Sequence, residues 1–181
     1  MKKLLFVPAM ATVLFLASCG GGNESSESAT TDTTTTETAT APAEAPGADI
    51  PGIDTVQVTD HIDLEGMDNM KFDKTLFKVK AGQDIKLTLK NVGKLPAEAM
   101  SHNVVVLAQG TDVQAFGEAA VPAKPDHIPA AMAADVIAHT KLLGPGESDT
   151  ITFKFDDAGV YDFICSFPGH FGTMRGKIVV E

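Results

Sequence analysis

Three side chains with affinity for soft metals lie within ten residues near the end of the chain. They are Cys165, His170 and Met174, in a segment that reads Cys-Ser-Phe-Pro-Gly-His-Phe-Gly-Thr-Met. The segment joins two predicted strands, and a loop in that place can turn all three side chains toward one point. A thiolate, two imidazoles and a distant thioether suit copper in both oxidation states. The loop therefore predicts a copper site, provided that a second imidazole comes from elsewhere in the chain.

His102 is the best candidate for the second imidazole. It opens the apolar run 102–107, in which a strand would support a ligand rigidly. Taken singly, a Cys, a His or a Met is more often an ordinary core residue than a ligand. Their combination in one exported β domain favours the metal. Zinc accepts Cys and His but gives Met174 no role.

The elements that must position these residues are short strands. Apolar and polar residues alternate with a period of two, and turn signals such as Ala-Gly-Gln-Asp at 81–84 separate the runs. This pattern predicts a β-sandwich. An Ala-rich stretch broken by prolines, 112–134, is expected to form a short helical flap outside it. The predicted strands are 55–64, 76–79, 84–91, 103–108, 149–155, 159–164 and 177–180.

The N-terminus predicts export and lipid attachment. Two lysines, an apolar run too short to span a bilayer and the ending Leu-Ala-Ser-Cys predict a lipoprotein signal peptide over 1–18 and acylation of Cys19. The alternative is a plain cleaved signal that happens to end at a cysteine. Beyond Cys19 the only cysteine is Cys165, so no intrachain disulfide can form. A lone thiol in an oxidising compartment has to be buried or bound to metal.

Residues 19–53 have the composition of a tether. They are rich in Gly, Ser, Thr, Ala, Pro and Glu, with almost no large apolar side chains to offset the loss of chain entropy on folding. Seven acidic and no basic residues lie between Gly20 and Asp54. The formal net charge of the chain is −10, and no basic footprint for nucleic acid is present. The folded domain is expected over 54–181.

With these residues in place, the segment from about 62 to 180 resembles the azurin family of cupredoxins. The resemblance is carried by Leu-Glu-Gly at 64–66, Met-Lys-Phe at 70–72, Met-Ser-His-Asn at 100–103, Val-Ile-Ala-His-Thr-Lys-Leu at 136–142 and the loop 165–176. The spacing from Cys165 to His170 to Met174 matches the azurin loop length, whereas plastocyanin-like loops are shorter. The resemblance implies an all-β Greek-key sandwich of seven to eight strands.

The resemblance also implies a role for each site residue. His102, Cys165 and His170 would be strong ligands, Met174 a weak axial ligand and the Ser101 carbonyl a longer contact. Azurins usually have glycine at the position of Ser101, and a positive φ there would displace that carbonyl. Two further roles follow: the side chain of Asn103 would tie the ligand-bearing loops together, and the amide of Phe167 would face the sulfur.

One-electron transfer is the function that the resemblance implies, with no substrate of its own. An apolar docking patch is expected at Met70, Met100, Phe167, Pro168 and Phe171. Partners would be c-type cytochromes and a terminal oxidase or reductase, met in transient complexes. The residue after Cys19 is not acidic, which favours the outer membrane, with the domain in the periplasm or at the cell surface.

Three other functions compete with this one. Copper delivery would need an open, exchangeable site rich in Met or His, and an oxidoreductase would need a pocket and an open coordination position. A multicopper enzyme would need paired His motifs, which the sequence does not contain. His61, His127 and His139 are expected to be solvated.

Overall fold

The computed structural model describes residues 44–181. The predicted signal peptide, Cys19 and the tether up to residue 43 lie outside this part of the chain. Within the described part, no helix has both the length and the apolar character needed to cross a membrane.

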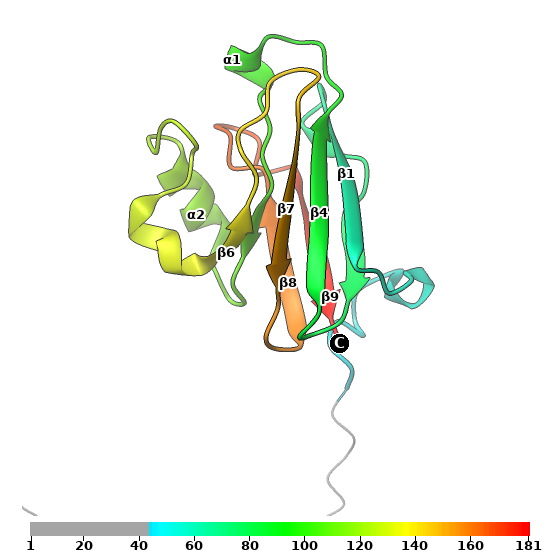
Figure 1. Ribbon diagram of the computed structural model, residues 1–181. Coiled ribbons are helices and arrows are strands. Elements are labelled where there is room, and N and C mark those ends of the chain that lie inside the picture. The colour runs from blue at the N-terminus through cyan, green and yellow to red at the C-terminus, as the bar shows by residue number, and fades with distance from the viewer. Residues whose placement is uncertain (1–43) are drawn as a thin grey trace, which may run out of the picture. The chain divides into compact units, whose positions relative to one another are not determined.

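Nine strands form two sheets in the described residues (Figure 1). The first sheet has the order β2 (Lys71–Phe72), β1 (His61–Met67), β4 (Asp84–Asn91) and β7 (Ser148–Lys154). The second has the order β3 (Leu76–Val79), β9 (Arg175–Val180), β8 (Gly159–Ile164), β5 (Val105–Leu107) and β6 (Val136–His139). The pairs β1–β4 and β3–β9 are parallel, and the others are antiparallel. The predicted all-β sandwich is confirmed.

The core lies between the two sheets because the strands alternate in the predicted way. In β4, for example, Ile85, Leu87 and Leu89 have no exposed surface, while Asp84, Lys86 and Lys90 face solvent. Each such side chain contributes about 1.5–3 kcal/mol when it leaves water. The core thereby fixes the strand ends from which the site residues project.

The N-terminal boundary differs from the prediction. The first strand begins at His61, and a 3-10 turn, η1 (Ile53–Thr55), precedes it. Ile53 is buried, and Gly47 lies close to the side chains of Val160 and Val179. The chain therefore packs on the sandwich before residue 54. Polar composition concealed these contacts because only a few scattered residues make them.

Two strands escaped the sequence pattern. β2 is only two residues long, and β6 is half-buried over its first three residues and exposed at His139, so neither shows an alternation. The segment that contains β6 had been recognised as a motif but not as a strand.

The flap is an excursion with its own small core. Its helix α2 (Val113–Ala120) begins at Asp112, whose side chain accepts hydrogen bonds from the amides of Gln114 and Ala115. Phe116 packs against Val105, Leu107 and Ile164 of the second sheet. After a turn that contains three prolines, the 3-10 segment η2 (Ala130–Asp135) leads into β6. The flap therefore covers the side of the sandwich near β5 and β6 (Figure 1).

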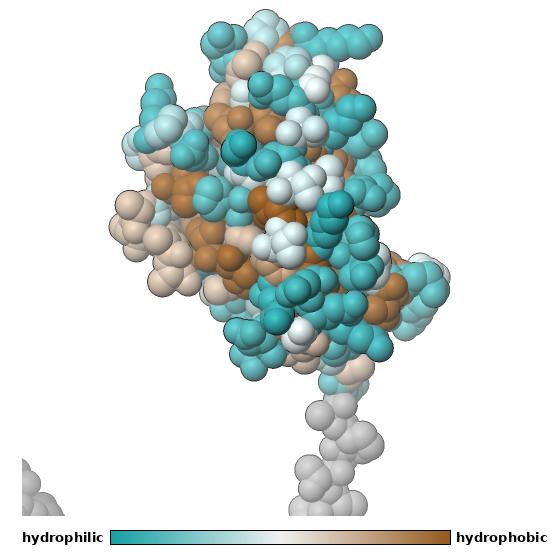
Figure 2. All heavy atoms as spheres, in the orientation of Figure 1, coloured by the Kyte–Doolittle hydropathy of each residue, from teal (hydrophilic) through white to brown (hydrophobic). Residues whose placement is uncertain are grey.

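Figure 2 shows how polar and apolar side chains divide one face of the molecule. Apolar and small residues gather on the side of the flap, and polar residues cover much of the remaining face. A last short helix, α1 (Ala97–Met100), lies in the connection between β4 and β5.

Candidate metal centre

The fold brings together three of the predicted ligands. The Sγ atom of Cys165 lies 3.9 Å from Nδ1 of His102 and 3.7 Å from Nδ1 of His170. The three ligand atoms lie within 4.8 Å of one another, and all three side chains are buried. Atoms at these separations can share one ion at the usual bond lengths of about 2.0–2.3 Å for nitrogen and sulfur.

Backbone hydrogen bonds hold each of these residues in place. His102 precedes β5 and pairs with Leu143 through two bonds, from its amide to the Leu143 carbonyl (3.0 Å) and from the Leu143 amide to its own carbonyl (2.8 Å). Cys165 directly follows β8, and its amide donates to the Met174 carbonyl at 2.8 Å. The two ends of the loop are thereby closed on each other.

The loop itself is a series of tight turns. The amide of His170 donates to the Phe167 carbonyl (3.0 Å), and the amide of Met174 donates to the His170 carbonyl (2.8 Å). Gly169 has φ +84°, a left-handed conformation that glycine adopts without steric cost. The Pro-Gly pair therefore turns His170 back toward Cys165.

Met174 and Ser101 complete the predicted set. Met174 is fully buried in the main core, next to Gly66 of β1: a Cβ atom added at Gly66 would lie 3.2 Å from its Cε. Ser101 immediately precedes His102 and is extended, with φ −73° and ψ 147°. Its backbone does not need glycine, so the expected conflict at this position does not arise.

Burial sets the protonation of the ligands. Loss of solvent lowers the pKa of His102 from 6.5 to about 4, with a further decrease from His170, while the Met67 carbonyl and Asp68 oppose the shift. Burial likewise lowers the pKa of His170. It raises the pKa of the Cys165 thiol to about 12. Without metal, the site therefore holds two neutral imidazoles and a thiol, and a bound cation would displace the thiol proton.

Two amides face the Cys165 sulfur. Those of Asn103 and Phe167 both favour the thiolate and oppose the rise in its pKa. The sequence had predicted the Phe167 amide but not that of Asn103. The side chain of Asn103 also joins the two ligand-bearing segments: its Oδ1 accepts from the Ser166 amide (2.8 Å), and its Nδ2 donates to the Ser166 hydroxyl (2.9 Å).

Asn91 holds the segment that carries Ser101 and His102 through hydrogen bonds, and it had not been singled out from the sequence. It is fully buried at the end of β4, and its Nδ2 donates to the carbonyls of Met100 (2.9 Å) and Leu143 (3.0 Å). These two carbonyls flank the segment that carries Ser101 and His102. A buried polar residue at the end of an apolar strand was the available sequence signal.

The residues of the predicted docking patch do not all share one environment. All five are half-buried, but Phe171 alone packs against the flap core near Phe116. Phe167 and Pro168 line a groove of about 770 Å³. Its other lining residues are Ala97, Glu98, Ala99, Ser101, Lys124, Pro125, His127 and Leu142.

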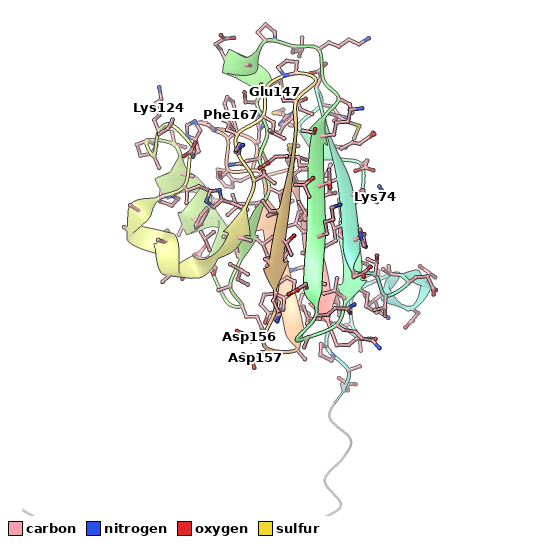
Figure 3. All side chains as sticks on the ribbon, in the orientation of Figure 1. Lys74, Lys124, Glu147, Asp156, Asp157 and Phe167 are labelled. Carbon is pink, nitrogen blue, oxygen red and sulfur yellow. The ribbon has the colours of Figure 1, made fainter. Side chains whose placement is uncertain are left out.

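The imidazole of His170 lies beneath this groove. The ring of Phe167 packs on that of His170 with 4.8 Å between centroids, and His170 is only 2% exposed. Neighbouring side chains therefore cover the edge of the His170 ring. Figure 3 shows Phe167 toward the same end of the molecule as Lys124 and Glu147.

The expectation of three solvated histidines holds for two of them. His61 and His139 are exposed, whereas His127 is 5% exposed. The His127 ring meets Phe167 edge-on, and its Nδ1 bonds to the Ala120 carbonyl at 2.9 Å. The prolines around it had suggested an open loop, but the flap folds back on the metal-binding end.

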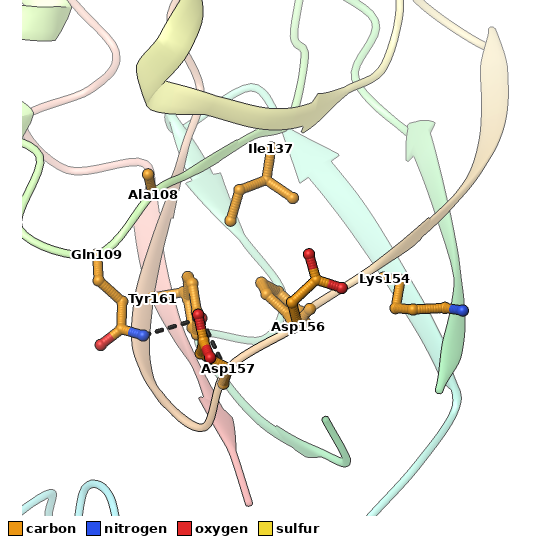
Figure 4. A pocket seen from close by; sticks show the side chains of 8 residues that line it. Ala108, Gln109, Ile137, Lys154, Asp156, Asp157 and Tyr161 are labelled. Atoms are coloured by element: carbon orange, nitrogen blue, oxygen red, sulfur yellow. Dashed lines mark hydrogen bonds between the residues drawn. The ribbon is translucent and has the colours of Figure 1, made fainter. Parts of the chain in front are cut away.

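A second cavity, of about 290 Å³, lies at the opposite end of β8 (Figure 4). There the hydroxyl of Tyr161 donates to the Asp157 carbonyl and accepts from Nε2 of Gln109, both at 2.8 Å. These bonds close the connection between β7 and β8. Their distance from Cys165 along the strand separates this cavity from the candidate metal centre.

Comparison with known proteins gives a consistent result. Residues 58–181 match the family of copper binding proteins described as the plastocyanin/azurin family. Azurin of Bordetella pertussis is 42% identical over 123 residues, which cover 65% of this chain and 81% of that protein. Azurin of Pseudomonas aeruginosa is 36% identical over 130 residues, which cover 66% and 84%. Outer membrane protein H.8 of Neisseria gonorrhoeae is 38% identical over 127 residues, or 65% of each chain.

Solved structures agree in fold. Reduced auracyanin of Roseiflexus castenholzii superimposes with a TM-score of 0.62 at 37% identity, over 69% of this chain and 99% of that one. An azurin of Methylomonas sp. strain J gives a TM-score of 0.60 at 26% identity, over 67% and 97%.

Proposed function

The chain belongs to the plastocyanin/azurin family of copper-binding proteins, and we propose that His102, Cys165, His170 and Met174 hold its single copper ion. The protein is a blue-copper electron carrier and not an enzyme. The observation that carries the assignment of ligands is the convergence of one buried thiol and two buried imidazole nitrogens at 3.7 and 3.9 Å.

The donor set fits copper better than zinc. The thiol and two imidazoles would serve either metal, but the buried thioether of Met174 beside them suits only the softer one. Bound copper supplies a one-electron couple between Cu(I) and Cu(II). We propose that the backbone carbonyl of Ser101, the residue before His102, would be a weak further ligand.

The protein's own contribution is to exclude water and restrict movement. The ligand side chains have at most 2% exposure, and the ligand segments are pinned by the Asn103–Ser166 and Asn91 hydrogen bonds. Since these hydrogen bonds fix the ligand segments independently of the ligand atoms, little rearrangement would accompany a change of charge at the site. Low rearrangement permits fast transfer at a modest driving force.

Electrons would enter and leave by way of His170. Its ring is separated from the groove by Phe167, whose centroid lies 4.8 Å away. We propose that redox partners dock over Met70, Met100, Phe167 and Pro168, with Phe171 supporting the loop from within. Small apolar contacts favour brief encounters. The proposed partners are c-type cytochromes and a terminal oxidase or reductase.

We further propose that the carrier is lipid-anchored through Cys19 and that residues 20–43 hold it away from the membrane. The sequence before the described residues supports this, as does the similarity to a protein named for its place in the outer membrane. Mass spectrometry of the full chain expressed in a bacterial host tests it: a diacylglyceryl adduct on Cys19 is expected, and an unmodified mature chain would refute the anchor.

The visible spectrum of the copper-loaded full chain tests the ligand assignment. An intense blue band is expected because a thiolate-to-copper transition requires Cys165, and it should disappear in Cys165→Ser and bleach reversibly with reductant. A protein that binds Cu(I) or zinc yet stays colourless with Cu(II) would contradict electron transfer and favour copper handling.

A further inference from the structure

The turn at Asp126–His127 in the flap touches both residues whose amides face the Cys165 sulfur. The Asp126 carbonyl accepts a hydrogen bond from Nδ2 of Asn103 at 3.2 Å. The His127 ring stands edge-on to Phe167, with 5.5 Å between centroids and 74° between planes. Two independent contacts thus connect one turn of the flap with the two amide donors.

His127 is itself firmly anchored. Its Nδ1 donates to the carbonyl of Ala120, the last residue of α2, at 2.9 Å. Its φ of +56° is a left-handed conformation that costs free energy in any residue with a Cβ atom. A buried side chain that keeps such a backbone is held by its surroundings, so the turn has a single well-defined position.

We propose that the Asp126–His127 turn is a positioning element of the copper centre, with His127 as its anchor. It holds Asn103 and Phe167 so that their amides point at the Cys165 sulfur. This inference rests on the proposed function and adds the flap to the parts of the protein that set the redox properties of the site. It assigns His127 no contact with the metal.

The electronic consequence has a definite sign. Amide donors withdraw electron density from a thiolate and so favour the reduced site. If Phe167 is held less firmly, the hydrogen bond from its amide to the sulfur lengthens, and more electron density stays on the sulfur. The charge-transfer band should then move to longer wavelength, and the reduction potential should fall.

The test compares His127→Asn with His127→Phe in the copper-loaded full chain. Asparagine tolerates a positive φ but removes the ring, so H127N should show the red-shifted band and the lower potential. Phenylalanine keeps an aromatic edge against Phe167 but lacks the donor for the Ala120 carbonyl, so H127F should return both values only part of the way toward those of the wild type. Exposed His61 offers a matched control: H61N should change neither.

Each outcome decides the question. If H127N keeps the wild-type band and potential while its metal-free form is only less stable to urea, His127 fills space in the flap and the proposal is wrong. If H127N does not fold, His127→Gln gives the same comparison, since it retains bulk and an N–H donor for Ala120. A wild-type protein without a blue band would refute the proposed function, whereas a blue wild type with unchanged variants refutes only this inference.

Discussion

Replacing Gly66 by alanine should distort the metal centre from outside the ligand set. Gly66 lies in β1 opposite Asn91 of β4. A methyl group there would lie 2.8 Å from Cδ2 and 3.2 Å from Cγ of His102, and 3.2 Å from Cε of Met174. Carbon atoms in contact need about 3.5–4.0 Å, so the imidazole has to move by about 0.7–1.2 Å.

Such a movement is large for this site. Metal–ligand distances tolerate about 0.2 Å, and the backbone of His102 is fixed by its two bonds to Leu143. Overpacking of this kind costs about 1–3 kcal/mol. We therefore expect G66A to lower the free energy of unfolding of the metal-free protein by that amount and to shift the visible band of the copper form.

Urea unfolding and absorption spectroscopy measure the two effects. Gly172→Ala is the matched control, because Gly172 lies in the ligand loop and an added Cβ atom would meet nothing within 4 Å. G172A should resemble the wild type in both assays. If G66A were as stable as the wild type and had its spectrum, the close approach of β1 to His102 would place no constraint on the site.

Three further predictions concern stability. The free energy of unfolding of the metal-free protein should fall by up to about 3 kcal/mol as the pH decreases from 6.5 to about 4. The reason is that the pKa of His102 is lowered on folding, so that in this range the unfolded chain binds a proton that the folded chain does not. Urea midpoints at about pH 7 and about pH 4.5 measure this effect, and equal midpoints would refute it. Asn103→Ala should cost about 1–3 kcal/mol in urea unfolding, since the buried amide of Ser166 loses its acceptor; unchanged stability would show that another group replaces it. Tyr161→Phe should cost about 0.5–1.5 kcal/mol through its bonds to Asp157 and Gln109 and leave the copper spectrum intact; a changed spectrum would contradict the separation of the two ends of β8.

The ligand loop could be predicted from sequence because its information is local. Cys165, His170 and Met174 are close in the chain, and a Pro-Gly turn between strands leaves few ways to arrange them. His102 required a longer step, which its place at the start of an apolar run made possible. The sandwich followed from the alternation that strands such as β4 show over eight residues.

What escaped prediction depends on contacts between distant segments. His127 looks like a loop residue because prolines surround it, and only the folding of the flap onto the loop buries it against Phe167. The sequence around Phe171 looks the same whether this side chain faces a partner or the flap core. Gly66 has no chemistry of its own to mark it, and Asn91 is marked only as a polar residue at the end of an apolar strand, since the roles of both come from what lies next to them.

These supporting residues explain how neutral, buried groups can stay in place for a cation. Two imidazoles and a thiol are better solvated in water than in this buried site, so burial alone would not keep them there. The main chain around each of them is held by hydrogen bonds that do not involve the ligand atoms. The free energy of folding therefore offsets the desolvation of the donor atoms, and the free energy of metal binding does not have to assemble the site. A carrier that must return to the same geometry in both charge states needs that division of labour.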